Sequence, residues 1–236
     1  MDITDALKSK LDLAIEKLHN PFERQFVASQ INVNERIIIQ QCPFPYQYFF
    51  EHSNGGYSKY YARHLYGYSP EPGHNVFSMN NHNLWKKYYG LTENDFCFAE
   101  TITGNQHFFK LNSDDSAIYR LYIETGTIEK EYDDFSEFLI SEYSDISPHE
   151  SDVYIYEEVK KIRGEASLYP IHIGCIQPVL LGGSELDSSN YDYIDPLTHL
   201  SICGQLYSQL EKMKHGIIVK NVSIDPDTME ISIEIE

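Results

Sequence analysis

The stretch between residues 96 and 143 constrains the fold of this chain more than any other part of its sequence. Four short runs rich in aromatic and β-branched residues follow one another there, at 96–100, 106–111, 117–123 and 127–132. Turn-forming Gly, Asn, Asp and Ser residues separate the runs, so the pattern predicts strands joined by tight turns. Residues 135–143 then carry apolar side chains at helical spacing. We therefore predict an α+β fold in which a helix packs on one face of an antiparallel sheet.

The rest of the chain carries helical and extended patterns as well. Apolar residues at helical spacing predict a helix at 3–18, and Asp195-Pro196 is a typical opening for another helix that runs to Met213. The run Arg36-Ile-Ile-Ile-Gln40 lies before two prolines and predicts a short strand. Further expected elements are a helix end at 46–52, a short helix at 84–89, a charged helix at 151–163, a polar loop at 182–190 and a C-terminal hairpin at 217–235.

The charge balance limits the partners that this chain is expected to bind. Its 36 acidic residues outnumber the 18 basic ones and give a net charge of −18. A surface this negative repels phosphate backbones, so we expect no direct binding of nucleic acid. The same charge would speed the encounter with a basic protein. The alternative is that the acidity serves only to keep the protein in solution.

The sequence shows no pattern typical of a membrane-spanning segment, a secretory signal or a disulfide-bonded protein. No apolar run approaches the roughly 20 residues needed to span a bilayer, and the opening Met-Asp-Ile-Thr-Asp lacks the pattern of a secretory signal. We therefore expect no membrane association and a cytoplasmic location. The cysteines are far apart in the sequence and form no Cys-x-x-Cys pair, which predicts free and mostly buried thiols at Cys42, Cys97, Cys175 and Cys203.

The sequence carries no recognisable motif for catalysis or cofactor binding. It has no glycine-rich phosphate loop and no Gly-x-Ser-x-Gly nucleophile motif. No cysteine lies in a recognisable nucleophile signature. The i, i+4 spacing of a helical zinc motif is lacking in the two histidine pairs that come into question, His74 with His82 and His52 with His64. We therefore predict a protein that is not an enzyme and needs neither a metal nor another cofactor.

Tyrosine is frequent in this chain, with 19 residues that cluster at 46–68 and 191–193. Because tyrosine is enriched at protein interfaces, these clusters are candidates for a binding surface. The alternative place for them is the core or the margins of the sheet, where we expect most of the tyrosines to lie. Within the first cluster, Asn54-Gly-Gly56 predicts a sharp change of direction with positive φ angles.

The order of several short motifs gives the chain a family resemblance. The motifs are Gly55-Gly-Tyr57, Trp85, Phe98-Ala-Glu100 with Gly104-Asn-Gln106, Ile118-Tyr-Arg120, Glu124-Thr-Gly126 and Phe135-Ser-Glu-Phe138. In this order they resemble the SUKH superfamily, which groups the yeast cell-wall assembly regulator, bacterial Syd-like proteins and many bacterial toxin-immunity proteins. The resemblance covers residues 35–143. The chain departs from the compact form of the family in a long loop at 69–83 and in the residues added at its C-terminus.

The resemblance implies a SUKH-like α+β fold, with an antiparallel or mixed sheet and flanking helices. We assign residues 1–145 to this domain, including the N-terminal helix. Residues 146–236 then form a C-terminal α/β extension that ends in a helix and a hairpin. This extension either packs on the first domain or folds as a second small module.

The resemblance also implies binding without catalysis. Family members of the immunity type bind a cognate toxin and block it, and they require no cofactor and no small-molecule substrate. Many such toxins are nucleases with basic surfaces, which an acidic chain would cover in place of nucleic acid. One alternative is an intracellular SUKH-fold scaffold or regulator that binds an endogenous protein. The other is a hydrolase or carbohydrate-binding enzyme built around the aromatic cluster.

The candidate partner contacts are aromatic and acidic residues that we expect to be exposed. They lie in the turn after the paired glycines and in the polar C-terminal loop: Tyr57, Tyr60, Tyr61, Asp187, Tyr191, Asp192 and Tyr193. The alternative role of each is solvated surface or packing against the sheet. No catalytic and no metal-binding residue is assigned.

Overall fold

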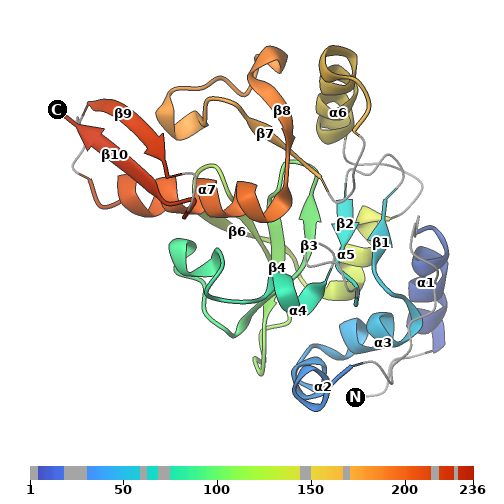
Figure 1. Ribbon diagram of the computed structural model, residues 1–236. Helices are drawn as coiled ribbons and strands as arrows, with labels where there is room; N and C mark the ends of the chain where they lie inside the picture. Colours follow the sequence, from blue (N-terminus) through green and yellow to red (C-terminus); the bar gives the residue numbers. More distant parts are fainter. Residues whose placement is uncertain are drawn as a thin grey trace.

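The computed structural model describes residues 5–18, 31–58, 63–68, 75–143, 150–166, 171–213, 218–225 and 228–236. A six-stranded sheet forms the centre of the molecule, with its strands side by side in chain order (Figure 1). The strands are β1 (Gly56–Tyr57), β2 (Arg63–Leu65), β3 (Asp95–Thr101), β4 (Gln106–Lys110), β5 (Ile118–Tyr122) and β6 (Thr127–Tyr132). Every pairing in this sheet is antiparallel. The α+β class with flanking helices is therefore confirmed.

The predicted strands at 96–132 correspond to β3 through β6. Gly104 and Gly126 make the turns after β3 and β5, and both have a positive φ angle, of 86° and 70°, which glycine adopts without a Cβ clash. β3 is buried along its whole length, whereas β6 forms an edge of the sheet and is mostly exposed. The sequence pattern identified these strands because their turns and their alternation are local features.

One face of the sheet packs against helices from the first part of the chain and from the segment after β6. These are α1 (Asp5–Glu16), α3 (Phe44–His52) and α5 (Phe135–Glu142), with α5 in contact with the other two. Tyr46 of α3 lies at the centre of an aromatic core. Its ring centroid is 5.8 Å from that of Phe98, 5.2 Å from Phe109 and 5.1 Å from Phe135. The predicted helices at 3–18, 46–52 and 135–143 are confirmed.

The predicted strand at 36–40 is wrong, because these residues belong to helix α2 (Val33–Gln40). A capping box at the start of the helix explains the difference. Asn32 accepts a hydrogen bond from the backbone N–H of Glu35, at 3.0 Å, and the Glu35 carboxylate accepts one from the backbone N–H of Asn32, at 2.9 Å. The three isoleucines favour strands by their β-branched side chains, but this cap and the tertiary packing of Ile39 override that preference.

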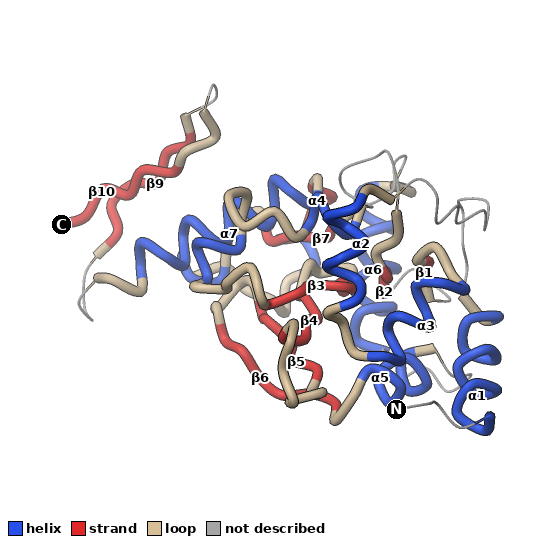
Figure 2. The backbone as a smooth tube through the Cα atoms, turned by 90° about the horizontal axis from the view of Figure 1, so that it is seen from below, coloured by secondary structure: helices blue, strands red, loops and turns tan. Residues whose placement is uncertain are grey.

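The second face of the sheet is covered by the helix that the sequence predicted after Asp195. Helix α7 (Pro196–Leu210) packs on the 3-10 helix η4 (Lys86–Tyr89), and the rings of Tyr207 and Tyr89 stack with centroids 5.6 Å apart. Leu200 and Cys203 of α7 belong to the same hydrophobic core as the sheet. Figure 2 shows α7 and the short helix α4 (Val76–Met79) on the side of β3 and β4 opposite to α5.

Two small antiparallel strand pairs complete the C-terminal part. β7 (His172–Cys175) pairs with β8 (Tyr191–Ile194), and the backbone N–H of Ile173 joins this pair to the turn after β3 by donating to the carbonyl of Ile102, at 2.8 Å. Helix α6 (Glu150–Arg163) packs beside β8. β9 (Val219–Ile224) and β10 (Ile231–Ile235) are the predicted C-terminal hairpin, which stands out from the body beyond α7 (Figures 1 and 2).

The segment between β7 and β8 contains two 3-10 helices, of which the second lies at the end of the polar loop predicted at 182–190. They are η5 (Val179–Leu181) and η6 (Ser188–Asn190). All four cysteines are free, and three of them are buried, as predicted. None of the helices in the described ranges is long and apolar enough to cross a membrane.

Candidate functional site

A pocket of about 450 Å³ lies between the β7–β8 pair, helix α7 and the β9–β10 hairpin. Its walls are mainly aliphatic, with Ile176, Ile202, Leu206, Val222 and Ile231 among the lining residues. The hairpin closes one side because it is fastened to α7: the Gln205 side chain accepts a hydrogen bond from the backbone N–H of Ile231, at 2.9 Å. The pocket is therefore a feature of the C-terminal part of the chain alone.

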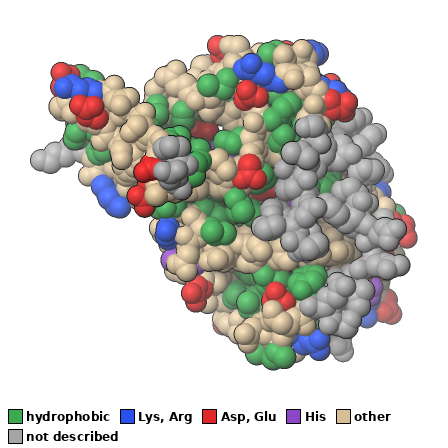
Figure 3. Space-filling view, viewed as in Figure 1, with side chains coloured by type: hydrophobic (Ala, Val, Ile, Leu, Met, Phe, Trp, Pro, Cys, Tyr) green, Lys and Arg blue, Asp and Glu red, His purple; other side chains and the backbone are tan. Residues whose placement is uncertain are grey.

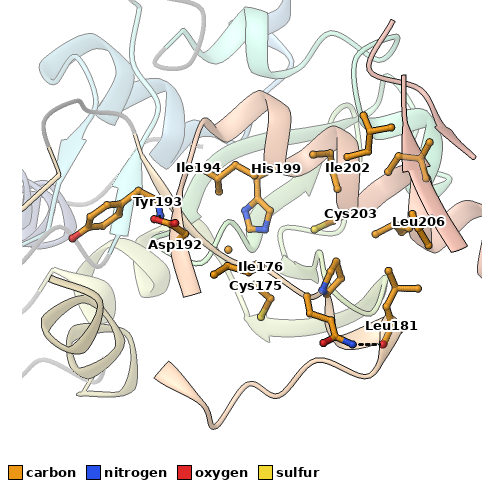
Figure 4. Close-up of a pocket in the computed structure, with 16 residues that line it drawn as sticks. Cys175, Ile176, Leu181, Asp192, Tyr193, Ile194, His199, Ile202, Cys203 and Leu206 are labelled. Carbon is orange, nitrogen blue, oxygen red and sulfur yellow. Dashed lines mark hydrogen bonds between the residues drawn. The ribbon is translucent and has the colours of Figure 1, made fainter. Parts of the chain in front are cut away.

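Three polar side chains with reactive atoms line this pocket beside the aliphatic ones. His199 and Cys203 lie one turn apart on α7, and both are 3% exposed. Cys175 comes from the end of β7. Figure 4 shows His199 and Cys203 pointing into the pocket, across from Cys175 and Ile176. Asp192 and Tyr193 of β8 also contribute to its lining.

A buried carboxylate, Glu100 of β3, lies behind the pocket. Its oxygens are 2.8 Å from His64 Nδ1 and 2.9 Å from His172 Nε2, and the Tyr66 hydroxyl and the Gln106 amide also donate to it. Burial alone would raise the pKa of Glu100, but the hydrogen bonds and charge interactions with His172 and His64 hold it well below its usual range. Glu100 is therefore an ionised carboxylate inside the core, satisfied by four donors.

A chain of polar contacts connects Glu100 to the pocket. His172 Nδ1 lies 3.2 Å from His199 Nδ1, and His199 Nε2 lies 3.6 Å from an oxygen of Glu124. The same Glu124 oxygen is 3.7 Å from the Cys203 sulfur. Burial lowers the pKa of His199 from its ordinary value, so the imidazole is neutral at pH 7. These contacts join the central sheet, β7 and α7 into one buried polar network.

The thiols in the pocket are held in the protonated state. Burial, and next the Glu124 carboxylate, raise the pKa of Cys203 well above its ordinary value. Burial raises the pKa of Cys175 to about 12. A thiol must ionise to act as a nucleophile, so neither cysteine is activated for attack at neutral pH. The side chains that are placed together in a way that suits a metal ion are Glu124, His199 and Cys203.

The structure separates the predicted partner contacts into two groups. Tyr57 is 3% exposed and stacks on the ring of His64, with centroids 4.4 Å apart, so the expected exposure of Tyr57 is wrong. Tyr57 lies in β1, and the main chain there pairs with β2. Tyr60 and Tyr61 lie outside the described residues.

The predicted contacts of the C-terminal part lie close together. Tyr191, Asp192 and Tyr193 form strand β8 rather than a loop, because they pair with β7. Tyr191 is 6% exposed and donates to the carbonyl of Glu185 at 3.0 Å, so the expectation that it is exposed is wrong. Asp192 is exposed, and the Tyr193 hydroxyl donates to the carbonyl of Gly164 at 2.9 Å. Asp187 is exposed and accepts the backbone N–H of Ser189 at the start of η6.

The residues that sequence reasoning did not find are Glu124, His199 and Cys203. One signal for them is present in the sequence, since His199 and Cys203 have i, i+4 spacing within a helix that the sequence predicts. A helical zinc motif of the His-Glu-x-x-His type has two histidines at this spacing, and the pair of His199 with Cys203 does not match it. Glu124 carries no such signal, because its approach to α7 depends on how the turn after β5 packs.

Comparisons with known proteins bear on the fold alone. No family model matches the sequence, and no curated protein matches it. A similar solved structure is the crystal structure of Atu4351 from Agrobacterium tumefaciens, with a TM-score of 0.50 and 13% sequence identity. The match covers 91% of this chain and 93% of that chain. At this level of identity the likeness concerns the fold alone, and it extends over the central sheet and the C-terminal part together.

Proposed function

We propose that this chain binds a partner protein with a basic surface and blocks it without catalysis, in the manner of an immunity protein that neutralises a cognate bacterial toxin. The observation that carries the proposal is the surface of the C-terminal part. Among the described residues from 171 onward, nine are acidic and two, Lys212 and Lys220, are basic. Such an excess of one charge attracts and orients a partner of opposite charge.

Apolar side chains on the same part of the molecule support this proposal. Leu186 is 98% exposed, Ile218 is 61% exposed and Ile176 is 58% exposed. In Figure 3, hydrophobic side chains lie between acidic ones on the face that carries the hairpin and its surroundings. Exposed apolar area with a polar rim is typical of a protein interaction site. Asp187 and Asp192 are the predicted contacts that belong to this surface.

The SUKH-like fold is part of the same proposal. Its support is the chain order of the antiparallel strands and the helix that follows β6, which are the elements that carry the quoted motifs. A toxin of the nuclease class would present a basic surface to the acidic residues of this chain, where nucleic acid would otherwise bind. We place this encounter in the cytoplasm.

Co-purification tests the proposal directly. The full-length chain is expressed with the product of the adjacent gene, and a stable complex that suppresses the toxic activity of that product is expected. Binding of that product without any toxic activity to suppress would favour the scaffold or regulator instead. Failure to bind any basic product of a neighbouring gene would contradict the immunity proposal.

Reversing the charge of exposed acidic residues tests whether the C-terminal surface is the interface with the partner. The double variant Asp187→Lys, Asp192→Lys is expected to weaken the complex by at least tenfold, because both side chains are exposed on the acidic C-terminal part. Asp114→Lys is the matched control, since Asp114 is exposed in the turn between β4 and β5. Equal loss of affinity in the control would show that the C-terminal surface is not the interface.

A further inference from the structure

Three metal-binding types of side chain meet beside the pocket, and two of them, His199 and Cys203, line it. The carboxylate of Glu124, the Nε2 atom of His199 and the sulfur of Cys203 all lie within 4.8 Å of one another. Glu124 comes from the turn between β5 and β6, and the other two come from successive turns of α7. The Glu124 oxygen lies 3.6 Å from His199 Nε2 and 3.7 Å from Cys203 Sγ.

Packing fixes the position of Glu124 relative to α7. The turn that contains Glu124 ends at Gly126, whose φ angle is 70°. A Cβ atom on Gly126 would lie 2.2 Å from the ring of Tyr207, which is a residue of α7. The turn therefore approaches the helix as closely as glycine allows. This contact brings the Glu124 carboxylate to His199 and Cys203 without any sequence motif that links them.

The contacts behind His199 occupy one of its two ring nitrogens. The Nε2 atom of His172 lies 2.9 Å from a Glu100 oxygen. The Nδ1 atom of His172 lies 3.2 Å from Nδ1 of His199. The Nε2 atom of His199 is on the other side of the ring, 3.6 Å from the Glu124 carboxylate.

The Nε2 atom of His199 has no hydrogen-bond partner within the part of the chain that the structure describes, and it is buried. The Glu124 oxygen at 3.6 Å is too far away for a hydrogen bond. The ideal Cβ position at Gly174 lies 2.7 Å from Nε2, so glycine at that position leaves room beside the nitrogen. A buried ring nitrogen without a hydrogen-bond partner is unfavourable, and a cation bound between it and the carboxylate would satisfy both groups.

The donor set fits zinc better than a harder cation. An imidazole nitrogen, a thiolate sulfur and a carboxylate oxygen are all common zinc ligands, whereas calcium and magnesium take oxygen ligands. Zinc bonds of about 2.0–2.3 Å place tetrahedral ligand atoms about 3.3–3.8 Å apart. The two separations from the Glu124 oxygen, 3.6 Å to His199 Nε2 and 3.7 Å to Cys203 Sγ, lie in that range.

We propose that Glu124, His199 and Cys203 bind a zinc ion, with the fourth coordination position directed into the pocket between α7 and the β7–β8 pair. Three protein ligands with one open position are the arrangement in which zinc binds water or an external ligand. Glu100 and His172 lie behind His199 and orient its ring, as a carboxylate commonly does for a zinc-bound histidine. Asp192 and Ile176 line the pocket and also belong to the surface proposed to bind a partner. None of the three metal ligands was assigned to that surface, so a failure to bind zinc would leave the partner proposal intact.

Metal titration of the full chain tests the proposal. The purified protein is stripped with a chelator, loaded with zinc chloride and passed through a desalting column, and bound zinc is measured by mass spectrometry. One equivalent of zinc is expected for the native chain. The variants Cys203→Ser and His199→Gln are each expected to lower the affinity by at least about 100-fold, because each removes a ligand. Cys42→Ala is the control and should retain one equivalent, since Cys42 is a buried thiol outside the pocket.

Cobalt provides a second measurement, and its first part uses the native chain alone. Loading the native chain with Co²⁺ is expected to produce the visible absorption of a tetrahedral site and a sulfur-to-metal charge-transfer band. The band should be present in Cys42→Ala and absent in Cys203→Ser. A native chain that retains neither zinc nor cobalt would overturn the proposal. Retention of full zinc binding by Cys203→Ser and by His199→Gln would do the same.

Discussion

Arg63 shows how single buried charges hold this molecule together. Its side chain is buried, and its Nε atom donates to Glu142 of α5 at 2.8 Å while its guanidinium also pairs with Asp152 of α6. Tyr132 of β6 donates to the same Glu142 carboxylate. Burial opposes the charge of Arg63, but the two carboxylates outweigh it and raise the arginine pKa. One residue of β2 thus joins the sheet to two helices that lie far along the chain.

Replacement of Arg63 by methionine is expected to lower the free energy of unfolding by about 3–5 kcal/mol. The reason is that two buried carboxylates are left without their cation. Lys130→Met is the matched control, because Lys130 pairs with Asp133 on the surface and should leave stability nearly unchanged. Urea denaturation of both variants beside the native chain measures the difference. Equal effects of the two substitutions would contradict this account of Arg63.

Buried ionisable groups also set the response of stability to pH. Burial lowers the pKa of His107 below its ordinary 6.5, so between these values the unfolded chain binds more protons than the folded one. The pKa of Glu100 lies below its ordinary 4.5, so protonation of the unfolded chain again opposes folding in that range. Both groups therefore stabilise the fold at neutral pH, and this stabilisation is lost progressively as the pH falls.

We expect the free energy of unfolding to decrease as the pH is lowered from 7 to 5, and to decrease further below 4.5. Urea denaturation at several pH values measures this slope. His107→Gln should flatten the curve between pH 5 and 6.5, because glutamine does not titrate and keeps a donor for Glu131. A native chain that is as stable at pH 5 as at pH 7 would show that these buried groups do not control its stability.

At the scale of the element, hydrogen bonds at the start of a helix outweigh the intrinsic secondary-structure preferences of the residues that follow. The capping box at Asn32 and Glu35 makes a helix of an isoleucine-rich segment, and Asp195 with Pro196 opens α7 as the sequence predicted. The Asp195 carboxylate accepts the backbone N–H of Thr198 at 2.8 Å. This cap lies one turn before His199, so it also sets the position of the side chains that line the pocket.

Asp195→Ala is expected to reduce the free energy of unfolding by about 0.5–2 kcal/mol, because the helix loses its capping acceptor. Asp195→Asn should retain most of the stability, since its amide oxygen can accept the same hydrogen bond. Thermal and urea denaturation of the two variants provide the comparison. Loss of the same size in Asp195→Asn would mean that the charge, and not the cap, matters at this position.

At the scale of the whole molecule, charge is distributed unevenly. The described residues from 171 onward carry nine acidic and two basic side chains, and they include the pocket and the projecting hairpin. Charged side chains inside the first part of the chain include internal pairs such as Arg63 with Glu142. The described residues before 171 carry 22 acidic and 13 basic side chains. The ratio of acidic to basic residues is therefore higher in the C-terminal part.

The rate of association with a basic partner is expected to fall steeply as ionic strength rises, while the dissociation rate changes little. The reason is that salt screens long-range attraction, with a Debye length of about 10 Å at 0.1 M. Stopped-flow or surface-based kinetics between 0.05 and 0.5 M salt measure both rates. The double variant Asp187→Asn, Asp192→Asn should depend less on salt than the native chain does. An association rate that is independent of salt would exclude electrostatic steering.

The sequence by itself determined the parts of this protein that depend on near neighbours. Strands β3 to β6, the turns at Gly104 and Gly126, helix α5 and the opening of α7 all follow from alternation, turn residues and caps within a few positions. The excess of acidic residues is also a property of the sequence alone. These features were predictable because the interactions that produce them are local.

Only the tertiary structure decided which side chains meet. Glu124 reaches His199 and Cys203 because the β5–β6 turn packs on α7, and Glu100 reaches His172 because β7 lies against the turn after β3. The burial of Tyr57 and Tyr191 likewise results from strand pairing that no local sequence pattern predicted. Contacts between distant segments depend on how complete helices and strands pack. The sequence around one residue of such a contact does not identify the other residue. For that reason the fold was largely readable from the sequence, whereas the pocket and its polar network were not.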